Sequence, residues 1–219
     1  MTNIEWVGQI DYAAALERQR ALAAALAAQP DSPDRLLLLE HPPTFTLGRR
    51  GDMRHLLVDE DTLARRGFAF HRVERGGDIT YHGPGQLVGY PILNLKRRYG
   101  ANTLDLHRYV SDIESVIIAA LRAFGVAGWR YPGYTGVWVS AADGAPAKIA
   151  AIGVRVSSKG ISSHGFALNV NPDLSHFDLI VPCGIREHGV TSLATFISQP
   201  VTIENVLPAI INSFHRIFD

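Results

Sequence analysis

Cysteine is nearly absent from this chain of 219 residues: Cys183 is the only one, so no disulfide within the chain can support the fold. A net charge is also absent, because 21 basic side chains balance 21 acidic ones. Without net charge the chain has no general electrostatic attraction to nucleic acid or anionic lipid, and we expect neither partner. Long hydrophobic runs are lacking too, since residues 21–28 are mostly alanine and a membrane-spanning helix needs about 20 apolar residues.

What remains is an ordinary globular composition, with 47% hydrophobic and 19% charged residues. These proportions exclude a disordered chain, and the length favours one folded unit, which we expect to be a single catalytic domain over residues 1–219. The first residues lack a basic region followed by an apolar core, so we expect no secretory signal. Together with the single cysteine, this predicts a cytoplasmic protein.

Hydrophobic periodicity predicts helices that alternate irregularly with short strands. Expected helices cover 12–28 after Asp11 as N-cap, 60–66, a segment from Asn102 or Thr103 to 124, and 202–218 after Thr202. Expected strands cover 35–40, 44–48, 69–75, 86–95, 136–140, 147–156 and 161–171. In 86–95 we expect Pro91 to interrupt the strand at an edge or a bulge. The order is not a regular strand–helix–strand alternation, which favours an open mixed sheet flanked by helices.

The stretch 75–86, RGGDITYHGPGQ, is the most unusual part of the sequence. Its glycines and proline exclude a helix or a central strand, and glycine clustering indicates close approach of the backbone to another group. A tight surface turn is the alternative. The stretch has neither the spacing nor the following helix of a nucleotide-binding loop.

Cys183 lies between Pro182 and Gly184, on an expected turn. A lone cysteine is often a small buried hydrophobic residue, but Gly184 leaves the neighbouring amide sterically open for an oxyanion. As a nucleophile, the thiol would need a cationic or basic partner to form the thiolate. Lys148 begins the apolar strand KIAAIGV, where a charge is costly unless it is paired, although a lysine at a strand end can also reach water. Spacing alone does not choose between Lys148 and the alternative bases His82, His164, His176 and His188.

Other catalytic patterns are missing from the sequence. It contains no HExxH, no GxSxG and no set of cysteines for zinc, so we expect no metal site.

Five separate blocks resemble the lipoyl(octanoyl) transferase family. They are RGGDITYHGPGQ at 75–86 with its continuation LVGYPILNL, EHPPTFTLG at 40–48, KIAAIGVR at 148–155, HGFALN at 164–169 and PCG at 182–184. The resemblance implies an α/β (α+β) fold of the biotin/lipoate protein ligase type, with a mixed, mostly antiparallel sheet flanked by helices. It also implies octanoyl transfer from octanoyl-acyl carrier protein to a lysine of lipoyl domains, in the E2 subunits of 2-oxoacid dehydrogenases or in glycine-cleavage H protein.

The resemblance further implies the roles of individual residues. Cys183 is expected to hold the acyl group as a thioester and Lys148 to lower the pKa of its thiol. Beyond the resemblance, we expect either Lys148, once neutral, or His82 to take the proton of the incoming lysine in the second half-reaction. The expected substrate-binding residues are Arg75, Gly76, Gly77, Asp78, Ile79, Thr80, Tyr81, His82, Ala151, Ile152, Gly153, Gly165, Phe166 and Ala167. No cofactor is expected, because a thioester donor is already activated.

Two rival functions remain open at this point. An ATP-dependent lipoate or biotin ligase on the same fold would form an acyl-adenylate and would not need Cys183. A non-catalytic acyl-binding module would bind ligand without turnover.

Overall fold

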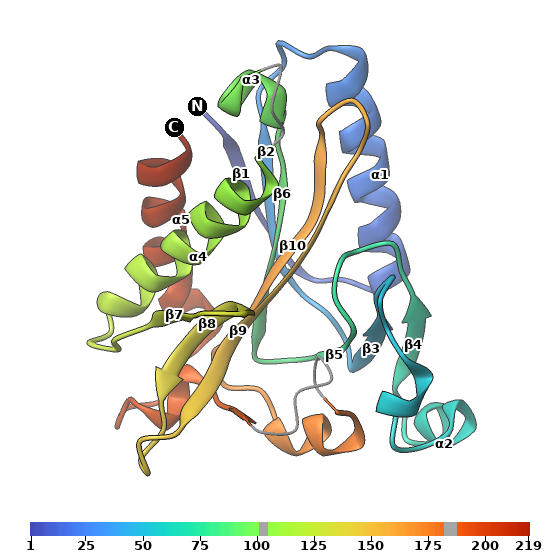
Figure 1. Cartoon of the computed structure of the whole chain (residues 1–219), viewed down its shortest axis with the longest axis vertical. Helices are drawn as coiled ribbons and strands as arrows, with labels where there is room; N and C mark the ends of the chain where they lie inside the picture. Colours follow the sequence, from blue (N-terminus) through green and yellow to red (C-terminus); the bar gives the residue numbers. More distant parts are fainter. Residues whose placement is uncertain (101–104, 182–187) are drawn as a thin grey trace.

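The computed structural model describes residues 1–100, 105–181 and 188–219, which form two sheets and the helices around them (Figure 1). The larger sheet has the strand order β1–β2–β6–β10–β9–β8–β7, with β11 beside β9. Its strands are β1 (Asn3–Gln9), β2 (Arg35–Glu40), β6 (Gln86–Ile92), β7 (Trp129–Tyr131), β8 (Tyr134–Ser140), β9 (Pro146–Val156), β10 (Ser162–Asn169) and β11 (Gly189–Val190). The pairs β1–β2 and β11–β9 are parallel and the others antiparallel, so the expected mixed, mostly antiparallel sheet is confirmed.

A smaller sheet of order β4–β3–β5 stands beside the larger one and is built from β3 (Thr44–Leu47), β4 (Ala69–Arg72) and β5 (Ile79–His82). The glycine-rich stretch therefore contains an edge strand, which the sequence did not predict. Strand β5 pairs antiparallel with β3, and its four residues are all buried. This pairing draws the preceding loop toward the larger sheet.

Helices cover both faces of the larger sheet (Figure 1). Helix α1 (Tyr12–Ala28) packs on one face, and α4 (Leu106–Arg122) and α5 (Ile203–Phe218) pack on the other. The short helix α2 (Glu60–Arg65) precedes β4, and α3 (Leu95–Tyr99) lies between β6 and α4. The predicted helices over 12–28 and 202–218 are confirmed, and the Asp11 side chain accepts hydrogen bonds from the amides of Ala13 and Ala14, as an N-cap should.

The run RLLLLE in β2 shows why a central strand is apolar throughout. Leu36 and Leu38 are buried under α4 and α5, whereas Leu37 and Leu39 are buried under α1. Successive side chains of a strand point to opposite faces, so both faces of this strand are covered. Each such leucine contributes roughly 1.5–3 kcal/mol by leaving water.

Helix α4 begins later than the sequence predicts. Its N-cap is Asp105, whose carboxylate accepts the amide of Arg108 at 2.8 Å, while the expected caps Asn102 and Thr103 lie outside the described residues. Leu106 keeps helical spacing with the buried residues Ile113 and Ile117, yet it is 45% exposed. It lies in the first turn, before the helix reaches the sheet.

The expectation that Pro91 lies at a sheet edge or a bulge is wrong, because β6 runs between β2 and β10 and its register with β2 passes through Pro91 without a shift. The pairing of β6 with β10 ends at Gly89 and Phe166, before the proline is reached. Beyond that point the hydroxyl of Ser162 donates to the Pro91 carbonyl at 2.7 Å and accepts the Leu93 amide at 2.9 Å. A side chain thus replaces the ladder on the side where proline has no N–H to donate.

Candidate active site

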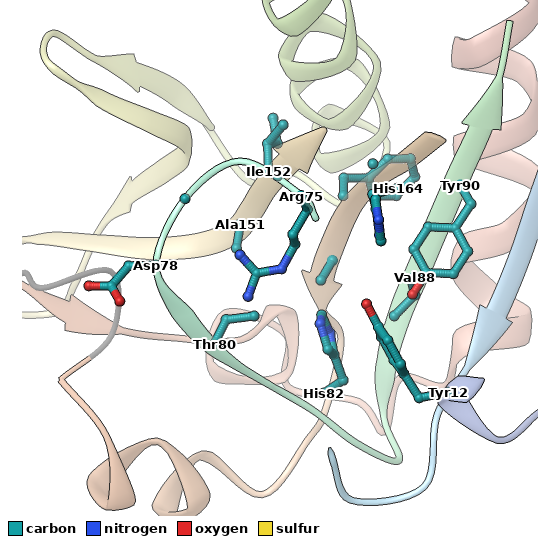
Figure 2. Close-up of a pocket in the computed structure, with 15 residues that line it drawn as sticks. Tyr12, Arg75, Asp78, Thr80, His82, Val88, Tyr90, Ala151, Ile152 and His164 are labelled. Atoms are coloured by element: carbon teal, nitrogen blue, oxygen red, sulfur yellow. The ribbon is translucent and has the colours of Figure 1, made fainter. Parts of the chain in front are cut away.

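A pocket lies on the α1 side of the larger sheet, between this sheet, the loop before β5, and the start of α1 (Figure 2). Its floor contains one row of small apolar side chains from three adjacent strands. Ala151 of β9 pairs with Ala167 of β10, which pairs with Val88 of β6. Residues paired in this way share a face of the sheet, so the three side chains form a continuous apolar strip.

The next row of the floor contains two glycines, Gly165 of β10 and Gly153 of β9, which pair with each other. A Cβ atom on Gly165 would lie 2.1 Å from the carbonyl oxygen of Gly89, and one on Gly153 would lie 2.9 Å from the carbonyl oxygen of Gly76. Both glycines therefore allow a close approach of neighbouring backbone that a side chain would prevent.

Replacing Gly165 with alanine is expected to lower the free energy of unfolding by about 2 kcal/mol, because the added methyl group must push β10 away from β6. Urea unfolding of the purified variant measures this change. Gly189→Ala is the matched control, since a Cβ there would meet no atom within 4 Å. Equal stability of the two variants would show that the strands adjust without strain.

The roof of the pocket is the loop before β5, held in place by Arg75. The Arg75 guanidinium donates from Nη2 to the Thr46 carbonyl at 2.6 Å and to the Thr46 hydroxyl at 2.7 Å. The Gly76 amide donates to the Val154 carbonyl at 2.9 Å, which ties the loop to β9. Gly77 adopts a φ of 87°, a conformation that favours glycine. Arg75 is 7% exposed, so the pocket contains a buried positive charge.

Asp78 lies at one rim of the pocket, and Figure 2 shows its carboxylate turned away from the interior. One carboxylate oxygen accepts the amides of Asp52 at 3.1 Å and Ile79 at 2.7 Å, and the other contacts Nδ1 of His55. Asp78 therefore fixes the loop to the segment around His55.

Strand alternation decides which residues of β5 reach the pocket. Thr80 and His82 line it, whereas Ile79 and Tyr81 point to the opposite side, into a core with Phe45 of β3. Hence two of the expected binding residues are structural members of the smaller sheet's core.

His82 has a defined tautomer. Its Nδ1 lies 2.7 Å from Oε1 of Gln86, while the Gln86 amide nitrogen donates to the Tyr81 carbonyl and the Asn169 side chain. Because Gln86 Oε1 can only accept, His82 carries its proton on Nδ1. Nε2 is then an acceptor, 3.3 Å from the Thr46 hydroxyl.

Burial of the ring, together with the nearby Arg75 charge, keeps His82 neutral. Burial lowers its pKa well below the usual value, and the nearby His41 and Arg75 lower it further. A histidine in this state is a weak base at neutral pH.

One end of the pocket is closed by two tyrosines, Tyr12 at the first turn of α1 and Tyr90 of β6. Figure 2 shows their hydroxyl groups directed toward one another, opposite the Asp78 rim. The Tyr90 hydroxyl lies 2.7 Å from Nε2 of His41. Burial raises the pKa of both tyrosines, so both stay protonated.

His164 borders the same end of the pocket. Its backbone has a φ of 56°, which is uncommon for a residue other than glycine, and its amide donates to Gln19 at 2.8 Å. Its Nδ1 is buried and has no hydrogen-bond partner among the described residues. Burial, followed by the charge of Arg75, lowers the pKa of His164 to about 4.

Lys148 lies on β9, outside the pocket lining, and is 8% exposed. Its Nζ sits 4.9 Å from the ring centroid of Trp138, which faces it across the β8–β9 pair. Such a contact stabilises a cation by the electron-rich face of the indole. The structure thus places this charge in a buried setting, as the apolar strand pattern suggested.

Cys183 falls outside the described residues, but the chain on either side of 182–187 is described. Before this segment, the Val181 amide donates to the His55 carbonyl at 2.7 Å. After it, Val190 pairs with Lys148 in the β11–β9 ladder. The segment therefore connects the Asp78 rim of the pocket to the strand that carries Lys148.

The structure gathers most of the expected binding residues in one pocket. Those that line it are Arg75, Gly77, Asp78, Thr80, His82, Ala151, Ile152, Gly153, Gly165, Phe166 and Ala167. Gly76, Ile79 and Tyr81 do not. Sequence reasoning assigned no function to Tyr12, because the helix it begins reads as an ordinary alanine-rich surface helix.

The described residues contain no group of three or more histidine, aspartate or glutamate side chains placed to hold a metal ion. No helix in the described part of the chain is long and apolar enough to span a membrane.

Known proteins resemble this chain in sequence and in structure. Residues 11–215 match the family model of the lipoyl protein ligase A/B catalytic domain. An octanoyltransferase from Rubrobacter xylanophilus is 49% identical over 96% of this chain and 90% of its own length, and one from Chloroflexus aggregans is 47% identical over 97% and 93%.

Among solved structures, a bipartite lipoate protein ligase from Thermoplasma acidophilum, studied with its E2 lipoyl domain, superposes with a TM-score of 0.74. It is 16% identical and covers 99% of this chain and 83% of its own. A lipoate-protein ligase A bound with ATP has a TM-score of 0.71 at 18% identity, covering 99% and 85%. At these identities the structures show the shared fold.

Proposed function

The chain belongs to the lipoyl protein ligase A/B catalytic domain family and is an acyltransferase that acts on octanoyl groups in protein lipoylation; we propose that it moves octanoate from octanoyl-acyl carrier protein to a lysine of a lipoyl domain. The acceptors would be lipoyl domains of 2-oxoacid dehydrogenase E2 subunits and of glycine-cleavage H protein. We take residues 1–219 as one catalytic domain.

The observation that carries this proposal is the apolar strip across β9, β10 and β6. Neighbouring strands are about 4.8 Å apart, so the strip from Ala151 to Val88 spans about 10 Å. An extended peptide advances about 3.5 Å for three bonds, so seven carbon–carbon bonds advance about 8 Å. An octanoyl chain fits this strip, and each buried methylene contributes about 0.8 kcal/mol of binding.

The thioester would lie at the Asp78 rim, where His55 contacts Asp78 and accepts the amide of Val181, the last described residue before Cys183. In the first half-reaction the Cys183 thiolate attacks the octanoyl carbonyl carbon, and the carrier's thiol leaves with a proton from the Lys148 ammonium. In the second, the acceptor lysine attacks the Cys183 thioester and gives up a proton, and the Cys183 thiolate is restored. Backbone amides near Cys183 or Gly77 would stabilise the oxyanion in both steps.

Two bases were open for the second half-reaction, and the geometry favours Lys148 over His82. The proton of His82 is committed to Gln86, and Nε2 faces the Thr46 hydroxyl. Its pKa is far below neutral, so it would gain a proton poorly from the incoming amine. We therefore assign His82 the role of shaping the pocket beside the acyl chain.

Intact-protein mass after mixing with octanoyl-acyl carrier protein tests the function. We expect an adduct of one octanoyl group on the native protein, which disappears when a lipoyl domain is added and the domain gains the same mass. Cys183→Ser is expected to form no adduct labile to hydroxylamine and to transfer no octanoate.

The rival functions give different results in the same experiment. An ATP-dependent ligase would keep its activity in Cys183→Ser when ATP and free octanoate are supplied. A non-catalytic module would bind the acyl chain without any covalent mass change. Either result would overturn the proposal.

A further inference from the structure

The end of the pocket farthest from the Asp78 rim is closed by Tyr12, the first residue of α1 (Figure 2). Tyr12 is 2% exposed and its ring stacks with the rings of His71 and His82, at centroid distances of 5.2 and 6.0 Å. Turning the Tyr12 ring aside would therefore break both stacking contacts.

The hydrogen bonds behind Tyr12, between His41 and Tyr90, have a fixed direction that starts at a backbone carbonyl. Nδ1 of His41 lies 2.8 Å from the Ile10 oxygen, which can only accept, so Nδ1 carries the proton. His41 is neutral, since burial lowers its pKa to about 4, and its Nε2 must accept the Tyr90 hydroxyl proton. The Tyr90 hydroxyl proton is thereby directed to His41, and its oxygen keeps a lone pair for the Tyr12 hydroxyl, which faces it in Figure 2.

His164 adds a polar element beside this wall. Its Nδ1 is buried in the pocket region without a partner among the described residues. A methylene group pressed against this nitrogen satisfies none of its hydrogen-bonding capacity, whereas a water molecule does. An acyl chain longer than the strip would have to displace the Tyr12 ring. It would also lie against the His164 ring and keep water from its Nδ1.

We propose that Tyr12, tethered through Tyr90 and His41 and flanked by His164, is the specificity-determining residue that ends the accepted acyl chain at about eight carbons. This inference rests on the proposed octanoyl transfer and goes beyond it, because it assigns chain-length selection to a residue of the N-terminal helix. It also gives the buried His41–Tyr90 pair a function, which is to hold the wall in position.

The test compares carrier proteins loaded with chains of 6, 8, 10 and 12 carbons as donors and a purified lipoyl domain as acceptor. Transfer is followed by mass, and kcat/KM is obtained for each donor. Tyr12→Phe keeps the ring and its stacking but removes the tether, and we expect it to raise the ratio of decanoyl to octanoyl transfer by roughly fivefold. Tyr12→Leu also opens space and should raise the ratio by roughly thirtyfold or more.

Tyr109→Phe is the matched control, because Tyr109 is a fully buried tyrosine of α4 that does not line the pocket. The ratio of decanoyl to octanoyl transfer in Tyr109→Phe should stay within about twofold of the native value. Thermal melting shows that each variant is folded, and Tyr12→Phe decides the outcome if Tyr12→Leu does not fold.

Each remaining outcome counts against part of the inference. An unchanged ratio in folded Tyr12→Phe and Tyr12→Leu would overturn it, as would an equal shift in Tyr109→Phe. A shift in Tyr12→Leu alone would overturn the role of the hydrogen-bonded tether. If the native protein transfers no octanoyl group at all, it is the proposed function that fails.

Discussion

Replacing Lys148 with methionine is expected to lower the rate of octanoyl transfer by about a thousandfold while the protein remains folded. The methionine side chain can still pack against Trp138, whose ring lies 4.9 Å from the lysine Nζ. The variant nevertheless loses the cation that would keep the Cys183 thiol ionised and later accept a proton from the attacking amine. Single-turnover transfer from octanoyl-acyl carrier protein measures the loss.

A second measurement separates the electrostatic role of Lys148 from a structural one. Because Cys183 is the only cysteine, alkylation by iodoacetamide reports on this thiol alone. The alkylation rate increases with pH as the thiol ionises. In Lys148→Met this increase should occur at a higher pH than in the native protein, because a thiol without a nearby cation ionises less readily. Lys148→Arg should retain the alkylation profile better than it retains transfer, because a guanidinium keeps the charge but cannot take up a proton.

Lys159 provides the matched control for these experiments. It is exposed in the turn between β9 and β10, where the Gly160 amide donates to the Ser157 carbonyl. Lys159→Met removes the same charge from the surface and should change neither transfer nor alkylation. If Lys148→Met alkylates with the native pH profile, the thiolate does not depend on this lysine, and another partner must be found.

Local patterns predict much of the framework. Asp11 and Thr202 mark helix starts because capping is a matter of a few neighbouring residues. The apolar strand around Lys148 likewise indicates a buried setting as one of two alternatives, the other being a side chain that reaches water. These features need little information from distant parts of the chain.

Features that depend on distant partners could not be predicted in this way. Pro91 is accommodated inside the sheet by the hydroxyl of Ser162, 71 positions away. The carboxylate of Asp78 turns outward because His55, on a separate loop, holds it. Motif matching therefore finds the segments of the site but not the orientation of each side chain within it.

The end of the pocket that Tyr12 closes could be predicted from the sequence even less. Tyr12, His41, Tyr90 and His164 come from α1, the β2–β3 connection, β6 and β10, and no spacing in the sequence relates them. The sheet topology alone brings β6 beside β10, and α1 then packs over both. Function is thereby assigned to a helix whose composition indicates only a stable surface helix.

Lowering the pH from 7 to 5 is expected to reduce the free energy of unfolding by several kcal/mol, because the buried histidines of the pocket are neutral in the folded protein. His41 and His164 have pKa values of about 4 in the fold, mainly through burial, and His82 is shifted in the same direction. In the unfolded chain a histidine titrates near pH 6.5. Between about pH 6.5 and 4 the unfolded chain therefore binds protons that the folded protein does not, and stability falls as the pH falls.

Each of His41 and His164 can contribute up to about 3 kcal/mol to this loss, which is complete only when the pH has passed below the folded pKa. Urea unfolding at pH 7, 6 and 5 measures how the free energy of unfolding depends on pH. Carboxylates contribute little to this dependence, because most titrate below pH 5. His41→Gln keeps a hydrogen-bonding side chain that cannot be protonated and should flatten the slope, whereas His107→Gln, at an exposed position of α4, should leave it unchanged. If the free energy of unfolding of the native protein does not change between pH 7 and 5, the histidines around Tyr12 are not held neutral. The hydrogen-bond direction inferred for His41 and Tyr90 would then be wrong as well.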